Sequence, residues 1–442
     1  MTERDDGKMG IWMTSALVVG VIIGAGIFML PVSLAPLGQN ALIAWPISGV
    51  GILCIAFALA QISRLGGDGI QANIEREFGP TVAFLVAWSF WFSNWVAAAS
   101  VAIGASAALS FIGAPFNATQ SVVPLAILCV VILTIVNAMG VRAAGRLSIL
   151  TVAIKVVPLL AVIWLFAERG TGAARFEPLA PMPITFTNLA AATALTFYTL
   201  TGFENATAPV GKVRDAERTL PRAIFRGTIF VVLLYMVAGT AILLLLPAGT
   251  IVSSPAPYAD VLVSRWGIVA ASLAALAIAI SAFGCLNGLI LGTGELTYSL
   301  ALRGDLPALL AKTRGGGTPV NAQILVAVLT ILLLLANSSK ATASLFTFII
   351  LLSAAGILPL YGVGALAAWK SNPAPGARIV CAVALLFVLF AAYGVGLEAN
   401  LWGLVLLAAG LAVRAAMHRL NSRAGSIPLE ATIPAATPGS SA

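Results

Sequence analysis

GVIIGAGIFMLP, residues 20–31, lies inside the first long apolar run of the chain and decides how the rest of the sequence is interpreted. Its hydrophobicity is typical of a membrane span, yet Gly24, Gly26 and Pro31 all weaken regular helix. The bilayer interior offers no water to backbone groups, so a helix unwinds there only where protein or a wet cavity satisfies its freed amides and carbonyls. The glycines therefore indicate either a ligand site or close helix packing through Gly20 and Gly24.

The composition excludes a soluble globular domain. Hydrophobic residues make up 60% of the 442 residues and charged residues 9%, whereas roughly a quarter of a soluble domain is charged. Runs of about 20 apolar residues are long enough to cross roughly 30 Å of hydrocarbon, and twelve such runs occur. We predict an all-α polytopic membrane protein with transmembrane helices at 11–36, 41–63, 81–112, 121–140, 147–167, 186–209, 223–247, 266–300, 319–336, 342–369, 376–394 and 399–417.

Basic residues indicate the orientation of these spans. When Lys and Arg are assigned to alternate sides of twelve spans, nineteen lie on the N-terminal side and four on the other. This bias follows the positive-inside rule and predicts that both termini are cytoplasmic. It also accounts for the net charge of +8 without nucleic-acid binding. We expect a cytoplasmic N-terminus at 1–10 with no removable signal peptide, and a disordered cytoplasmic tail at 421–442.

The sequence supplies little for chemistry other than transport. Four cysteines lie singly within apolar spans and His418 is the only histidine, so we expect no metal site, no cofactor and no enzyme activity. A channel stays open in principle, although no filter-like repeat occurs. A carrier of the major facilitator type would have a basic motif after the second span, which LGGDGIQANIER, residues 65–76, lacks.

The sixth span contains a second interruption. TFYTLTGFENATAP, residues 196–209, again places glycine and polar residues partway through a span, and it runs in the opposite direction to the first. Paired interruptions of this kind are typical of transporters built from two inverted repeats. Half-helix N-termini attract anions, and unwound carbonyls attract cations. We predict that the amides at 24–26 bind the carboxylate of an α-amino acid and the carbonyls at 198–201 its ammonium group.

These motifs resemble the amino acid-polyamine-organocation (APC) superfamily, whose members have the LeuT-type fold. The resemblance rests on residues 20–31, on FYTLTGFENA at 197–206 with KVRDAERTLPRAI at 212–224, and on ALRGDLPALLAKTRGGGTPVNA at 301–322. It implies inverted repeats at 11–167 and 186–369, with two more helices at 376–417. It also implies a secondary amino acid transporter of the inner membrane that works by alternating access, with a homodimer as an open expectation.

The resemblance assigns roles to individual residues. Ala25 and Gly26 match carboxylate-binding positions, Tyr198 an aromatic gate, Thr201 a carbonyl donor to the substrate amine, and Glu204 a glutamate beside the break. The predicted substrate-binding set is Ile23, Gly24, Ala25, Gly26, Phe90, Asn94, Tyr198, Thr201, Gly202 and Leu289, and the predicted coupling residues are Lys155 and Glu204.

Two departures from the family affect the predicted substrate. Arginine/agmatine exchangers place a tryptophan and an asparagine where this chain has Leu289 and Ala98, and Asn94 lies one turn earlier. We therefore expect a neutral or apolar amino acid, with a cationic amino acid/polyamine antiporter as the alternative. Exchange is favoured over proton symport.

Two ionisable residues within the predicted spans need partners. A buried lysine costs at least a few kcal/mol without them, and Lys155 resembles the lysine that replaces sodium in sodium-independent relatives. Three roles stay open for Lys155, namely proton coupling, a permanently charged tie between helices, and snorkelling to the interface. For Glu204, a structural carboxyl and a proton carrier are both open.

Overall fold

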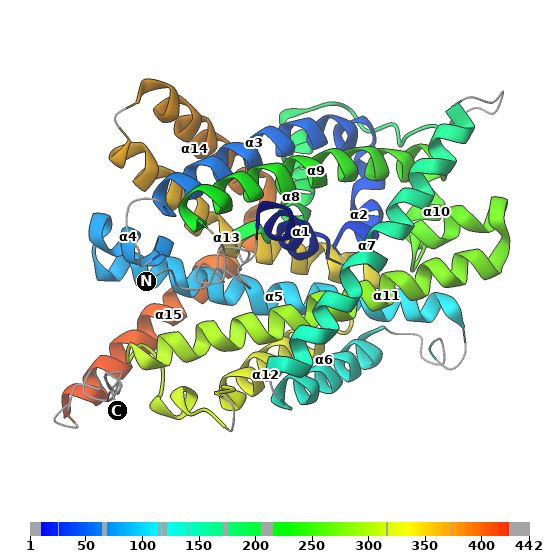
Figure 1. Ribbon diagram of the computed structural model, residues 1–442. Coiled ribbons are helices and arrows are strands. Elements are labelled where there is room, and N and C mark those ends of the chain that lie inside the picture. The colour runs from blue at the N-terminus through cyan, green and yellow to red at the C-terminus, as the bar shows by residue number, and fades with distance from the viewer. Residues whose placement is uncertain are drawn as a thin grey trace, which may run out of the picture.

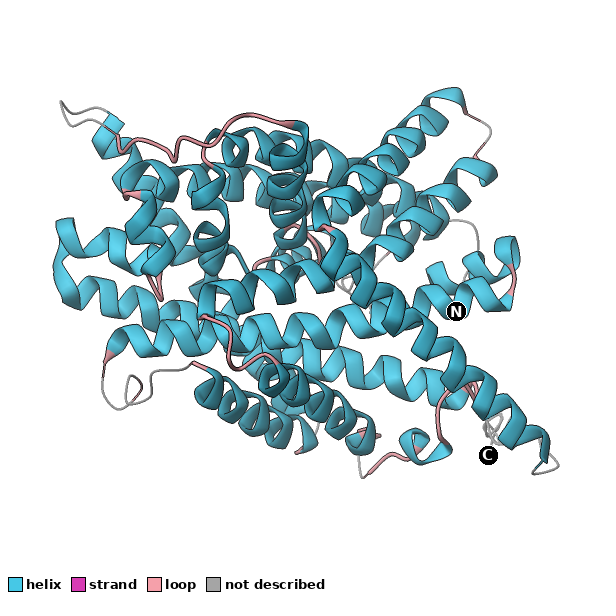
Figure 2. Cartoon of the chain, turned by 180° about the vertical axis from the view of Figure 1, so that it is seen from behind, coloured by secondary structure: helices cyan, strands magenta, loops and turns pink. Residues whose placement is uncertain are grey.

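The structure is a computed structural model, and it describes residues 10–24, 26–63, 69–113, 116, 122–139, 141–170, 176–204, 215–314, 317–372 and 374–423. In these ranges the only β contact is an isolated bridge between Arg314 and Thr318, and Figure 2 shows helices joined by loops. The prediction of an all-helical chain is confirmed for the described residues.

Figure 1 shows the helices arranged as one bundle. Within the described part, seven helices are long and apolar enough to cross a bilayer: α3, α5, α9, α11, α13, α14 and α15. The elements in chain order are α1 (Ile11–Ile22), α2 (Gly26–Leu34), η1 (Ala35–Leu37), α3 (Gln39–Ser63), α4 (Gly69–Phe78), α5 (Pro80–Ile112), α6 (Val123–Ala138), α7 (Val141–Gly170), α8 (Phe186–Thr199), α9 (Ala216–Leu245), α10 (Ala248–Ser253), α11 (Pro257–Leu302), η4 (Ala308–Ala311), α12 (Val320–Ala336), α13 (Thr342–Ser371), α14 (Pro375–Val395) and α15 (Leu397–Arg423).

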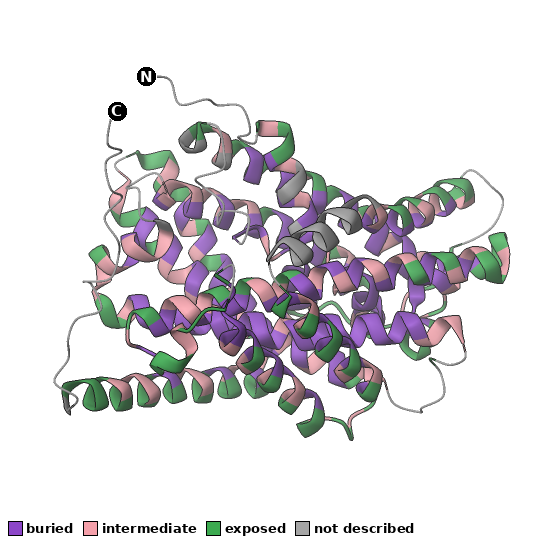
Figure 3. Ribbon diagram, turned by 60° about the horizontal axis from the view of Figure 1, so that its bottom comes forward, coloured by how far each residue is buried: buried purple, intermediate pink, exposed green. Residues whose placement is uncertain are grey.

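The centre of the bundle is formed by α5 and α11, which cross the middle of Figure 1 and pack on each other. Buried small residues line the second half of α5, from Ala98 to Ala108, and small side chains let helix backbones approach closely without the hydrophobic effect that operates in water. In its most apolar window, 78% of α5 is buried, against 11% of α15. Figure 3 shows the same gradient, with buried residues at the helix crossings and exposed residues on the outer faces.

Several predicted boundaries are wrong, for identifiable reasons. The apolar count missed α4 because charged residues interrupt it, and α10 because it has six residues. The predicted span from 266 begins where the structure has a break, because α11 consists of two helical segments that meet at Gly267, whose backbone is not helical (φ 78°, ψ 175°). At the C-terminus, α15 continues through Arg423, so residues 421–423 are helical and not part of a disordered tail. The rest of that predicted tail, 424–442, lies outside the described residues, as does the predicted N-terminal segment up to residue 9.

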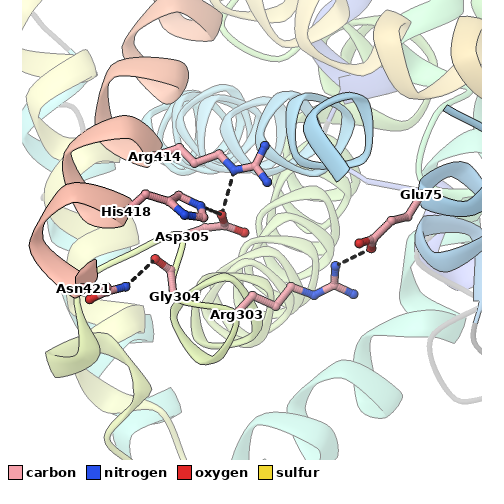
Figure 4. A network of polar contacts seen from close by, with 7 residues as sticks. All are labelled: Glu75, Arg303, Gly304, Asp305, Arg414, His418 and Asn421. Carbon is pink, nitrogen blue, oxygen red and sulfur yellow. Dashed lines mark hydrogen bonds and ion pairs between the residues drawn. The ribbon is translucent and has the colours of Figure 1, made fainter. Parts of the chain in front are cut away.

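A polar network joins α4, the end of α11 and α15 (Figure 4). The Arg414 Nε donates to the Asp305 Oδ1 at 3.1 Å, and the Asp305 side chain is 10% exposed. The guanidinium of Arg303 pairs with the Glu75 carboxylate at 3.2 Å. Because the buried Asp305 carboxylate also lies 3.8 Å from the His418 Nε2, one acid connects two turns of α15 to the end of α11.

Candidate substrate site

The first predicted span is interrupted at the glycines. Helix α1 ends at Ile22, Ile23 has extended geometry (φ −71°, ψ 91°), and α2 begins at Gly26. Ile23 is 1% exposed, and its amide still donates to the Val19 carbonyl at 2.9 Å. Gly24 forms the bend, and Ala25 lies outside the described residues. Pro31 does not end α2, so the glycines and not the proline mark the break.

The carbonyl end of α1 is capped by side chains from two other helices. The ammonium group of Lys155, on α7, donates to the Gly20 carbonyl at 2.8 Å, and Lys155 is 4% exposed. The Tyr235 hydroxyl, on α9, donates to the Ile22 carbonyl at 3.3 Å. A helix C-terminus carries partial negative charge, so the ammonium occupies a place where a metal cation would otherwise be attracted. A lysine held in this way does not snorkel to the membrane surface.

The second interruption begins where α8 ends, at Thr199. The Tyr198 carbonyl accepts from the Thr201 hydroxyl at 2.7 Å and from the Thr201 amide at 3.2 Å. The chain therefore already uses one of the carbonyls predicted to bind the substrate ammonium. Gly202 follows with φ of 112°, a value that a side chain would strain. The predicted span reaches residue 209, whereas helix α8 ends at Thr199. Residues 205–214 lie outside the described ranges.

Glu204 lies beside this break and is 8% exposed. Both carboxyl oxygens accept from the Gly202 amide at 3.0 Å, and the Tyr361 hydroxyl of α13 donates to Oε2 at 2.7 Å. The Phe203 ring stacks on Tyr361, with centroids 5.8 Å apart. If Glu204 were protonated, the carboxyl group would donate to the tyrosine oxygen instead, so the Glu204–Tyr361 contact is available in either charge state.

The two interruptions lie next to each other. A Cβ added at Gly26 would lie 3.4 Å from the Thr199 Cγ2 and 3.5 Å from the Tyr198 Cε1, and one added at Gly24 would lie 2.9 Å from the Cys285 Sγ of α11. The start of α2 therefore lies in van der Waals contact range of the end of α8, and Gly24 lies closest to α11. First-turn N–H groups of a helix lack intrahelical partners, so the start of α2 presents donors close to this junction.

Tyr198 is held at the junction by its hydroxyl, which shares a 2.7 Å hydrogen bond with the Ser100 Oγ of α5. Tyr198 is 7% exposed. The Cys285 sulfur of α11 lies against Gly24, 2.9 Å from the position of a Cβ added there. Side chains from α5, α7, α8, α9 and α11 therefore surround the break in the first span.

The residues of the predicted side-chain pocket, Phe90, Asn94 and Leu289, form no hydrogen bond to this junction within the described residues. The Asn94 amide donates to the Phe90 carbonyl at 2.9 Å, so its hydrogen bond stays within α5. Ala98 is fully buried, while Phe90 and Leu289 are half-buried and pack against the core. Within the described residues, no three His, Cys, Asp or Glu side chains gather as metal ligands.

Sequence reasoning missed four residues at the site: Ser100, Tyr235, Cys285 and Tyr361. Each is a small or aromatic residue within an apolar run, where core packing is the ordinary role. The hydroxyl of a tyrosine buried in a membrane needs a partner, which makes Tyr235 and Tyr361 noticeable in the sequence. Their partners, the Ile22 carbonyl and Glu204, lie 213 and 157 residues away, and only the fold brings them together.

Comparison with known proteins gives the family of the chain. A sequence model of the amino acid permease family matches residues 9–415. The cadaverine/lysine antiporter of Escherichia coli is 27% identical over 354 residues, covering 76% of this chain and 77% of the antiporter. The putrescine transporter PotE of E. coli is 26% identical over 420 residues, covering 91% and 94%, and that of Haemophilus influenzae is 25% identical over 407 residues, covering 90% and 94%. The apolar helices and these bacterial relatives support a multi-pass inner-membrane protein that transports and is not an enzyme.

Proposed function

The chain belongs to the amino acid permease family, and from this premise we propose that it is an antiporter that exchanges a cationic amino acid or a diamine by alternating access. Relatives named for cadaverine and lysine or for putrescine support this substrate class. The observation that carries the proposal is a buried carboxyl group, Glu204, at the interruption after α8.

The two helix interruptions offer complementary charges to such a substrate. The N–H groups at the start of α2 and the positive end of its dipole suit a carboxylate. The carboxyl group of Glu204 and the carbonyls after α8 suit an ammonium group. Lysine would use both sides, and a diamine would use the cation side alone. We place the remaining predicted contacts, at Ile23, Gly24, Ala25, Phe90 and Leu289, around the same substrate.

This proposal replaces the neutral amino acid that Leu289 and Ala98 predict, because the relatives do not support that preference. Leu289 and Ala98 lie on the eighth and third spans only. A substrate's second ammonium group needs a negative or carbonyl partner, and this chain supplies one on the sixth span. The loss of a stacking tryptophan weighs against a planar guanidinium, but an ammonium group has no such requirement.

We also propose the complete LeuT-type architecture. Twelve spans would comprise α1 with α2, then α3, α5, α6, α7, α8, α9, α11, α12, α13, α14 and α15, with the first five and the next five as inverted repeats. The adjoining interruptions, which lie at the start of each repeat, support this arrangement. Cytoplasmic termini follow from the distribution of basic residues, and a homodimer remains part of the proposal by resemblance.

We also propose that transport is independent of sodium, and the cap on α1 supports this. The Lys155 ammonium lies 2.8 Å from the Gly20 carbonyl, so a sodium ion at this helix end would meet a fixed positive charge. We propose that Lys155 stays charged and ties α7 to α1. Proton coupling through Lys155 or Glu204 is the second candidate role, since both groups are titratable and buried.

A counterflow screen tests the proposed substrate. Purified protein in liposomes loaded with unlabelled lysine, cadaverine or putrescine should accumulate the matching labelled compound without a sodium gradient. The twenty amino acids and common polyamines, each tried as the loaded compound, would define the substrate range. Counterflow by neutral amino acids alone would refute the cationic substrate and leave the exchanger intact, whereas no counterflow with any compound would refute the exchanger.

A further inference from the structure

A groove separates α3 from α9 on the outside of the bundle. The two helices lie side by side (Figure 1) and touch closely along part of their length. A Cβ at Gly49 would lie 2.6 Å from the Val232 Cγ1, and one at Gly239 would lie 2.5 Å from the Trp45 ring. Nearer the start of α9, a cavity of about 300 Å³ opens between them.

The groove is apolar along its floor and basic along one edge. Small and aromatic residues make up most of the lining, and two arginines of α9 complete it: Ala56, Phe57, Ala60, Gln61, Pro221, Arg222, Phe225 and Arg226. The lining therefore combines an apolar surface with two positive charges.

The arginines belong to a row. Arg218, Arg222 and Arg226 follow one another at four-residue spacing, so they share one face of α9 at intervals of about 6 Å. All three are exposed, and within the described residues no carboxylate forms an ion pair with any of them. Phe225 and Phe230 on the same helix are 44% and 49% exposed, as expected for a surface that faces lipid.

We propose that this groove binds one anionic phospholipid. Its phosphate pairs with Arg222 and Arg226, and one acyl chain lies between the small residues Ala56 and Ala60 and the ring of Phe225. Basic pockets between membrane helices recognise anionic headgroups in this way. A phospholipid has an apolar acyl chain and a charged headgroup. The apolar lining matches the acyl chain, and the adjacent arginines match the headgroup.

The lipid would act on the transport site through α9. Gly227, next to Arg226, packs on α1, because a Cβ there would lie 2.8 Å from the Val18 Cγ1 and 3.3 Å from the Ser15 carbonyl oxygen. Two turns further on, the same helix supplies the Tyr235 hydroxyl that caps α1. An occupied groove therefore holds α9 where it supports the break. This inference does not depend on which substrate is carried.

Native mass spectrometry of delipidated protein tests the site, with phosphatidylglycerol and phosphatidylcholine as probes. Wild-type protein should retain one phosphatidylglycerol much more tightly than phosphatidylcholine. Each arginine near an anionic headgroup contributes about 1 kcal/mol, so Arg222→Gln/Arg226→Gln should bind phosphatidylglycerol about thirtyfold more weakly. Inorganic phosphate should not compete, because it lacks the acyl chain.

Two further variants separate this site from general charge attraction and from misfolding. Lys312→Gln/Arg419→Gln removes two exposed charges elsewhere and should bind the lipid like wild type. Ala60→Phe fills the groove, keeps both arginines and should also lose the lipid. Equal binding of phosphatidylglycerol by wild type and the Arg222/Arg226 variant, or by wild type and Ala60→Phe, overturns the proposal. If the double variant elutes aggregated, Arg226→Gln alone gives the charge comparison.

Discussion

Replacing Lys155 by methionine tests how the interrupted first span is held. Methionine has a similar length and no charge, so the Gly20 carbonyl would lose the ammonium donor that lies 2.8 Å away. A hydrogen bond to a charged group contributes about 1.5–3 kcal/mol, and about 1.4 kcal/mol corresponds to a factor of ten. The state with the end of α1 in place should therefore become about ten- to hundredfold less populated.

The expected result is a ten- to hundredfold slower counterflow of the proposed substrate by Lys155→Met. The variant should still be made and purified, because removing a buried charge also removes its desolvation penalty and can leave stability unchanged. Size-exclusion profile and thermal stability check this point. Lys312→Met, which removes an exposed lysine, should transport like wild type.

The pH profile distinguishes the two roles left for Lys155. If the ammonium only ties α7 to α1, the residual activity of Lys155→Met should keep the wild-type dependence on pH. If Lys155 carries a coupled proton, that dependence should disappear together with the rate. A variant with the rate and the pH profile of wild type would refute both roles, and with them the argument that the helix end needs its charged donor.

Three other substitutions test separate contacts. Gly24→Ala should slow counterflow severalfold because the new Cβ would lie 2.9 Å from the Cys285 sulfur. Adding Cys285→Ala to this variant should restore part of the rate. A double variant no faster than Gly24→Ala would contradict this contact. Tyr361→Phe removes the donor to Glu204, a loss of about 1–3 kcal/mol for a buried carboxylate. It should weaken substrate affinity less than Glu204→Gln does, as measured by competition in uptake. Asp305→Asn should lower the melting temperature of the purified protein by several degrees, since it leaves a half-buried arginine of α15 without its carboxylate; a difference of less than one degree would mean that this network does not hold α15.

The helical framework follows from the sequence because its signals are local. Hydrophobic runs of membrane length need no tertiary information, and the glycines around residue 24 mark the end of α1 by their own backbone freedom. Boundaries failed where local signals conflict. Helix α4 carries charges and lies outside the apolar pattern, whereas the expected span start at 266 coincides with the break in α11 at Gly267.

The partners at the site could not be predicted in the same way. Lys155 was noticeable as a buried charge, but its partner is a main-chain carbonyl, which every residue possesses. Ser100 and Tyr198 are 98 positions apart and meet through their hydroxyls, and the Ser100 hydroxyl also donates to the Ala97 carbonyl of its own helix, as serine within a helix ordinarily does. One sequence gives the types of groups that need partners, and the packing of α5, α7 and α9 around the break selects the partners.

The two sides of the first interruption are not equivalent, and this asymmetry limits what the carrier can bind there. On the α1 side, Lys155 and Tyr235 donate to the carbonyls of Gly20 and Ile22, so a second cation at that end would be repelled by the ammonium group of Lys155. On the α2 side, the first-turn amides keep their partial positive charge. The break by itself therefore favours an anion, and any selectivity for ammonium must arise at the end of α8, where Glu204 lies. A substrate with both charges bridges the two interruptions, whereas a diamine engages only the second. Exchange of one for the other would then require the α2 amides to be alternately occupied by a carboxylate and by water.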